Sequence, residues 1–158
     1  MEKDKEIEKP KEAVYITHIS NVGKANKANK AKSYLVDVSC IKKSVVLFNH
    51  FNNADQKIQS KPFVINNGDD NALIFIVKYL NFYKDIDEIP PPEHPLLNIQ
   101  LNELFDIEQH IFGDLLIISN IDKKINIIKN LVEISEELQL EILLDKLAAI
   151  SCFYMQSL

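Results

Sequence analysis

The segment KPFVINNGDDNALIFIVKYLNFYKDIDEIPPPEH, from Lys61 to His94, carries the strongest fold signals in the chain. It opens with KPFVI, where Pro62 and the apolar residues after it predict a strand start or an edge strand. Turn residues follow at 66–69, and Asp69 or Asp70 is placed to cap a helix. Apolar residues in that helix recur at the spacing of one buried face: Leu73, Ile76, Val77 and Leu80. The segment therefore predicts a strand, a turn and a helix, ended by three prolines.

Two further strands are predicted before this segment. AVYITHI, from Ala13 to Ile19, alternates apolar with polar side chains and is rich in β-branched residues, which favours a strand. SYLVDV, from Ser33 to Val38, has the same character. The intervening NVGKANKANKAK is basic and of low complexity, so the two strands predict a hairpin with a long loop.

A helix is predicted after the second strand. The Ser39 hydroxyl is placed to accept a first-turn N–H, and the helix then runs to about Asn52. Its apolar stripe comprises Ile41, Val45, Phe48 and Phe51. We expect an α+β fold with a three-stranded sheet. Its core is expected to contain Val14, Ile16, Leu35, Val36, Phe48, Leu73, Ile76, Val77 and Leu80.

The second half of the chain, from Leu101 to Met155, has a helical pattern with one glycine and no proline. Asp122 is placed to cap a helix whose buried stripe is Ile125, Ile128, Val132, Ser135 and Leu138. A second stripe comprises Leu140, Leu143, Leu144, Leu147, Ile150 and Tyr154. The sequence SEELQLEILL between them contains no helix breaker. Either one long helix or a sharp turn near Gln139 fits this pattern.

Composition narrows the classes of function. The chain has 158 residues, about one domain, with 46% hydrophobic and 26% charged residues, as in globular proteins. The net charge of −5 and the lack of arginine argue against nucleic acid as the main partner. No apolar run approaches a membrane span, and the charged residues 1–12 predict a disordered tail and no secretory signal. We expect no membrane partner and a location in the cytoplasm or the nucleus.

Candidate reactive residues are few. Cys40 stands at a predicted helix start, where a thiol pKa is lowered, but a small buried residue is the favoured interpretation. Cys152 is expected in the core or an interface. A cluster dense enough to suggest a cation site flanks the prolines: Asp85, Asp87, Glu88, Glu93 and His94. The favoured interpretation is that these side chains are solvated surface charges and do not bind a cation. No nucleophile, base and oxyanion donor occur together, so we expect no enzyme activity, no metal and no cofactor.

The order of the elements resembles the BTB/POZ fold, and more closely the Skp family, the S-phase-kinase-associated adaptors of SCF ubiquitin ligases. YLVDVSCIKKSV, from Tyr34 to Val45, is similar to that family's Val-Asp-Val strand leading into a helix. The segment from Lys61 to His94 resembles its Pro-rich strand, long helix and Lys-Asp followed by Pro-Pro-Pro-Glu. LVEISEELQLEILLDKLAAISCFYM, from Leu131 to Met155, resembles its paired helices. There the matching residue types are Leu138, Leu143, Leu144 and Asp145.

The resemblance implies a non-catalytic adaptor with a BTB/POZ-like core at 13–94 and a truncated helical segment at 95–158. In the family the POZ face binds a cullin and the C-terminal helices bind an F-box-type substrate receptor, for ubiquitin-dependent protein degradation. The candidate receptor interface comprises Ile128, Leu131, Val132, Leu140, Leu143, Leu147, Ile150 and Tyr154. The last helix is expected to leave an apolar face uncovered, for an F-box-like motif or a second copy of this chain.

Departures from the family pattern favour an alternative. The family carries an Asn-Tyr pair that contacts the cullin, where this chain has Glu136 and Glu137. Unpaired carboxylates are costly to desolvate at a packed interface, so we expect weakened cullin binding. The family's glycine between the paired helices is also absent. The alternative is a diverged BTB/POZ scaffold or assembly subunit, for example in chromosome segregation, that no longer binds a cullin.

Overall fold

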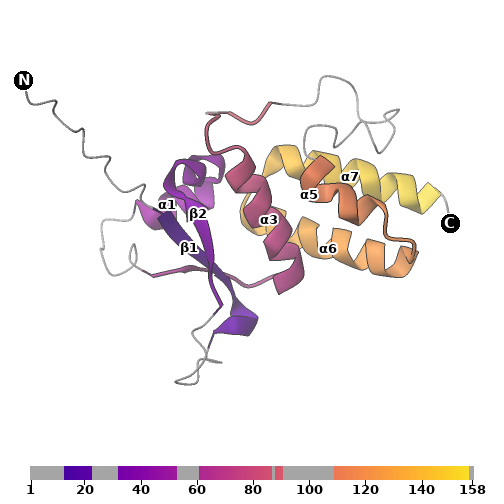
Figure 1. The fold of residues 1–158 in the computed structure, drawn as a ribbon, viewed down its shortest axis with the longest axis horizontal. Coiled ribbons are helices and arrows are strands. Elements are labelled where there is room, and N and C mark those ends of the chain that lie inside the picture. The colour runs from indigo at the N-terminus through magenta and orange to yellow at the C-terminus, as the bar shows by residue number, and fades with distance from the viewer. Residues whose placement is uncertain (1–12, 23–31, 53–60, 87, 91–108, 157–158) are drawn as a thin grey trace, which may run out of the picture.

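The computed structural model describes residues 13–22, 32–52, 61–86, 88–90 and 109–156. A small sheet lies at one end of the molecule, helices α5, α6 and α7 lie at the other, and α3 lies between them (Figure 1). The fold is α+β, with a three-stranded sheet and a helical C-terminal segment, as the sequence predicts.

The sheet has strand order β2-β1-β3, with β1 (Ala13–His18) in the middle. β2 (Tyr34–Asp37) pairs antiparallel with β1, which confirms the predicted hairpin. β3 (Phe63–Ile65) pairs parallel with β1 at the opposite edge. An edge position suits a strand preceded by Pro62, because proline has no N–H for a ladder.

The two faces of the sheet differ sharply in exposure. Ile16, Val36 and Ile65 are fully buried on the face toward the core. Tyr15 and Leu35, which are Cα partners across β1 and β2, are each 52% exposed on the other face. The prediction that Leu35 is buried is therefore wrong. Side chains alternate along a strand, so Leu35 and its neighbour Val36 point to opposite faces.

The predicted helix from Ser39 to Asn52 is two elements. A 3-10 helix, η2 (Val38–Lys43), is capped by Asp37, which accepts the Ser39 N–H. The α-helix α1 (Val45–Phe51) is capped by Ser44, whose Oγ accepts the Leu47 N–H. Ser44 is extended, so the helical phase restarts there. Leu47 is consequently buried, and Phe48 is 42% exposed, contrary to the prediction.

Helix α3 (Asp70–Phe82) matches its prediction closely. The Asp69 carboxylate caps it by accepting the Ala72 N–H over 2.7 Å. The predicted stripe is buried throughout: Leu73, Ile76, Val77 and Leu80. This helix is covered on two sides, because it contacts β2 and η2 on one side and α5 and α6 on the other. Another 3-10 turn, η1 (Ile19–Asn21), follows β1.

Three helices form the C-terminal segment: α5 (Gln109–Leu116), α6 (Ile121–Glu137) and α7 (Glu141–Gln156). The cap of α6 is Asn120, whose Oδ1 accepts the Lys123 N–H, and not Asp122 as predicted. Asp122 lies in the first turn, where the negative charge of a carboxylate interacts favourably with the helix dipole. None of the helices among these residues is long and apolar enough to cross a membrane.

The chain turns sharply between α6 and α7, which settles the open alternative in favour of two helices. Leu140 donates its N–H to the Ser135 carbonyl, and Gln139 donates to the Glu136 carbonyl. This pair of bonds is the Schellman helix ending, which needs a left-handed residue after the cap. Gln139 takes that position with φ 55°, where glycine is the usual residue.

The core is continuous from the sheet to α7. It includes Ile16 and Val36 from the sheet, Leu73 and Ile76 from α3, and Leu131 from α6, all fully buried. A hydrogen bond also joins distant parts, because the Ser44 Oγ donates to the Leu138 carbonyl over 2.6 Å. The sheet and the C-terminal helices therefore pack as one body around α3.

Candidate functional site

Most of the candidate receptor interface lies inside the chain's own core. Six of its eight residues are at most 3% exposed: Ile128, Leu131, Leu140, Leu143, Leu147 and Ile150. The expectation of an uncovered face on α7 is therefore wrong at Leu143, Leu147 and Ile150. Val132 is half-buried, and the Tyr154 side chain lies outside the described residues. The six buried residues can support a partner surface but do not form one.

An exposed apolar stripe lies instead along one edge of α6. Ile121 is 46% exposed, Ile125 is 37% exposed, and Val132 is half-buried. Their spacing of four and seven residues places them on one line of the helix. We call these three residues the α6 stripe. Ile117, which precedes α6, is 78% exposed. The sequence placed Ile125 and Val132 within the buried stripe, because both lie beside its boundary.

Two carboxylates on α6 hold the turn between β3 and α3. The Glu137 carboxylate accepts the backbone N–H groups of Asn66 and Asn67, each at 3.0 Å, and both side-chain amides, at 3.1 and 2.9 Å. The Glu133 Oε2 accepts the Gly68 N–H at 3.0 Å. Three consecutive N–H groups thus point at two carboxylates one helical turn apart. We call this arrangement the turn clamp.

Close packing at Gly68 completes the turn clamp. Gly68 has φ +69°, and a Cβ added there would lie 2.7 Å from both the Asn130 carbonyl oxygen and an Ile134 carbon. Asn130 also donates its side-chain amide to the Asp69 carboxylate at 3.0 Å. Glycine is needed here for its conformation and its size. The clamp therefore brings the backbone of the turn directly against α6.

The turn clamp changes the interpretation of Glu136 and Glu137, which stand where the sequence resemblance to the Skp family leads one to expect an Asn-Tyr pair. Glu137 is already paired by several hydrogen bonds within the chain, whereas Glu136 is exposed. The desolvation argument for a carboxylate without partners therefore applies to Glu136. Replacing Glu137 by tyrosine would also remove the clamp. Weakened cullin binding stays a prediction.

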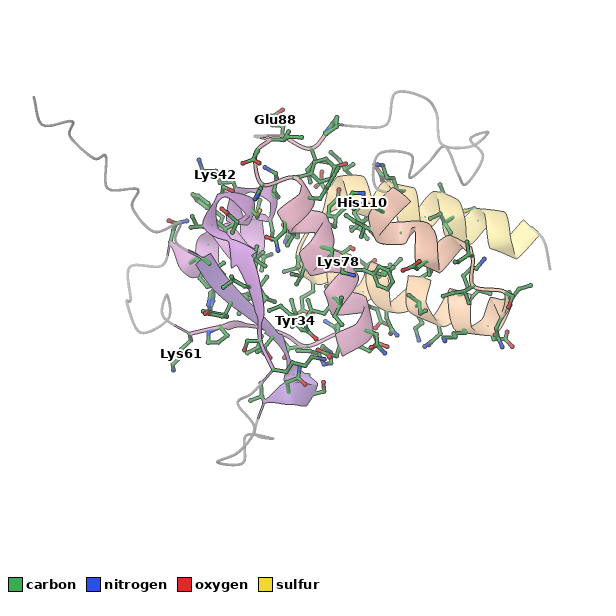
Figure 2. All side chains as sticks on the ribbon, viewed as in Figure 1. Tyr34, Lys42, Lys61, Lys78, Glu88 and His110 are labelled. Atoms are coloured by element: carbon green, nitrogen blue, oxygen red, sulfur yellow. The ribbon has the colours of Figure 1, made fainter. Side chains whose placement is uncertain are left out.

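A second polar junction ties the start of α3 to the hairpin. Asp70 accepts the Lys32 ammonium and the Asn21 amide, each at 2.9 Å. Partial burial opposes ionisation, but hydrogen bonds led by that from Lys32 outweigh it and hold the pKa of Asp70 below its ordinary value. The Asp70 carboxylate in turn raises the pKa of Lys32. Tyr34 lies near this end of α3 (Figure 2), with the Lys32 ammonium 5.6 Å from its ring centroid.

A pocket of about 380 Å³ opens where η2, the residues after α3 and the α6–α7 turn meet. Its apolar lining comprises Val45, Ile89, Leu140, Ile142 and Leu143. Lys42 and Glu88 flank it on the same side of the molecule (Figure 2). Lys43 and Glu141 also line it. The pocket can seat an apolar side chain. Charges of both signs line it, so it selects neither an anion nor a cation.

The two cysteines differ in environment. Cys40 is fully buried and its Sγ donates to the Leu80 carbonyl, so the prediction of a small core residue is confirmed. Burial raises the pKa of its thiol, the opposite of what a nucleophile needs. Cys152 is exposed on α7, so the core interpretation is wrong for it. The described residues contain no cluster of three potential metal ligands, and Asp87, Glu93 and His94 lie outside them.

The comparisons with known proteins add no assignment. No protein-family model matches the sequence, and no curated protein is significantly similar to it.

Proposed function

We propose that this chain is a non-catalytic adaptor of the Skp type, acting in the cytoplasm or nucleus. It would link an F-box-type substrate receptor to a cullin in ubiquitin-dependent protein degradation. The resemblance of the sequence segments suggests the family, and the α+β fold with its C-terminal helical segment is compatible with it. An adaptor also needs two surfaces at a fixed separation. Packing of α3 against α6, together with the turn clamp, gives the chain that rigidity.

The α6 stripe is the observation that carries the proposal. Apolar side chains in line on a helix surface suit a partner helix, which recognises anchors at this spacing. Exposed Ile121 and Ile125 would make the contact, with half-buried Val132 beside them. The buried residues Ile128 and Leu131 would hold the stripe in place from beneath. This assignment moves the receptor surface from α7, where the sequence placed half of the candidate residues, to the outer edge of α6.

The test is capture of recombinant F-box receptors by the full chain. Ile125→Asp places a charge in the α6 stripe and should abolish capture. Asn126→Asp adds the same charge one residue away at an exposed position and should leave capture unchanged. Failure of the unmodified chain to bind any F-box receptor would overturn the proposal. Light scattering of the same three proteins shows whether a second copy of the chain occupies the stripe instead.

A second candidate function is the diverged scaffold that does not bind a cullin. It is favoured by the turn clamp, because Glu137 serves the chain's own fold where the family presents a tyrosine to the cullin. Calorimetry with a cullin N-terminal domain separates the two functions. Tight binding by the unmodified chain would exclude the scaffold, whereas absent binding together with F-box capture would favour it.

A further inference from the structure

Asn67 and Gly68 form the one Asn-Gly dipeptide in the sequence, and both belong to the turn clamp. An Asn-Gly sequence is the most reactive context for deamidation, because glycine leaves the next backbone nitrogen unhindered. Asn67 is exposed, so water reaches it. We propose that Asn67–Gly68 is a site of spontaneous deamidation that the closed turn clamp holds off, and that the modification, once made, keeps the clamp open.

The reaction needs only water. The backbone nitrogen of Gly68 attacks the side-chain carbon Cγ of Asn67, and a nitrogen–carbon bond forms. The Cγ–Nδ2 bond breaks, and ammonia leaves with the proton released from the Gly68 nitrogen. Water then opens the resulting cyclic imide at either carbonyl, which gives aspartate or isoaspartate at position 67. No oxidation or reduction takes place.

The turn clamp blocks both reacting groups. The Gly68 N–H, which must lose its proton, donates to the Glu133 carboxylate at 3.0 Å. A negative charge at that distance disfavours the deprotonated amide. The Asn67 amide nitrogen donates to Glu137 at 2.9 Å, which restrains rotation of the side chain. Reaction therefore requires local opening of the clamp, and its rate follows the population of the open state.

The product would oppose reclosure. Asn67 donates to Glu137 through both its backbone and its side-chain nitrogen. Deamidation replaces the side-chain donor with a carboxylate, so two like charges then face one another where a hydrogen bond had been. An isoaspartate additionally lengthens the backbone beside Gly68, which has no spare room against Asn130. The contact between the β3–α3 turn and α6 is weakened in either case.

The test compares deamidation rates in the full-length protein, in mildly alkaline buffer at a temperature where circular dichroism shows every variant folded. Peptide mapping by mass spectrometry locates aspartate and isoaspartate at residue 67. Glu137→Ala should deamidate at least about tenfold faster than the unmodified chain. Glu136→Ala, altered at the exposed neighbouring position, should match the unmodified chain. Equal rates for the two alanine variants would overturn the protective role of the clamp.

A second comparison covers the case in which Glu137→Ala fails to fold. Asn67→Ala removes the side-chain donor, and Asn67→Asp also adds the product's charge. Asn67→Asp should have the lower urea midpoint of the two, and added salt should narrow the difference. Equal midpoints would overturn the claim that the modification holds the clamp open. This inference does not rest on the adaptor function, because neither measurement involves a partner.

Discussion

The carboxylate of Glu137 accepts the backbone N–H of Asn67 over 3.0 Å, although the two residues lie 70 positions apart in the sequence. One side chain on α6 thereby fixes the loop that leads from the sheet into α3. Hydrogen bonds to a charged acceptor contribute more than neutral ones. Glu137 therefore contributes, with the shared core, to the relative placement of the sheet and the C-terminal helices.

Glu137→Ala should lower the free energy of unfolding by about 1–3 kcal/mol, because it leaves several N–H groups of the turn without their acceptor. Urea denaturation measures the change as a lower midpoint with an unchanged slope. Glu136→Ala is the matched control, since Glu136 is adjacent and exposed. A midpoint for Glu137→Ala equal to that of the control would contradict the stabilising role of the clamp.

Leu73→Ala should destabilise the fold by about 2–5 kcal/mol, because the side chain is fully buried on α3 and its loss leaves a cavity. Leu35→Ala should cost less than about 1 kcal/mol, since half of that side chain is already in water. The shifts in urea midpoint of the two variants measure both losses. Similar losses at the two positions would show that the outer face of the sheet is covered in solution.

Gln139→Gly should stabilise the protein by about 0.5–1 kcal/mol. A side chain at φ 55° is strained by contact between its Cβ and the backbone, and glycine removes that contact. The gain is smaller than the strain because glycine has more freedom when unfolded. Thermal unfolding measures the shift, and a lower melting temperature would show that the Gln139 side chain has a stabilising contact.

Asp70→Asn should destabilise the protein at neutral pH, and the loss of stability should be smaller in acid. The pKa of Asp70 is lower in the folded state than its ordinary value of 3.8. Its contribution to stability is therefore present above pH 3.8 and lost as the pH falls through the folded-state pKa. Urea midpoints of both proteins, measured from neutral pH down to about pH 2, should converge. A constant difference over that range would exclude this linkage.

The two cysteines should react with thiol reagents at very different rates in the native protein. Cys152 is exposed, whereas Cys40 is fully buried and its thiol pKa is raised by burial. Mass spectrometry after brief maleimide treatment should show one label, and Cys152→Ser should remove it. Two labels added at the same rate would show that η2 and α3 separate readily.

The sequence was sufficient to predict a strand or helix wherever the signal for that element is local. Alternation identified β1, and helical spacing with an aspartate cap identified α3, because burial on one face requires those periods. Errors arose at short elements. The predicted apolar stripe that includes Phe48 requires one continuous helix from Ser39 to Asn52. The extended residue Ser44 interrupts that helix, so the helical periodicity starts again at Val45. Likewise, Asn120 and Asp122 both have capping side chains, and composition alone does not rank them.

The site was harder to predict than the fold because it depends on distant contacts. The residues next to Glu137 in the sequence predict only a charged surface position, because its hydrogen-bond partners lie on the distant turn before α3. The burial of Leu143 and Leu147 likewise depends on which helices pack against α7. One clue was present: NNGDD combines a turn with several donors, a combination that calls for a nearby acceptor.

The hydrogen bond from Ser44 to the Leu138 carbonyl joins residues 94 positions apart. A ribosome adding about 5–20 residues per second produces Leu138 roughly 5–20 s after Ser44. From the time α3 has been made until α6 follows it, the apolar side of α3 that packs against α6 has no native cover. The nascent chain therefore exposes this apolar surface until α6 has left the exit tunnel.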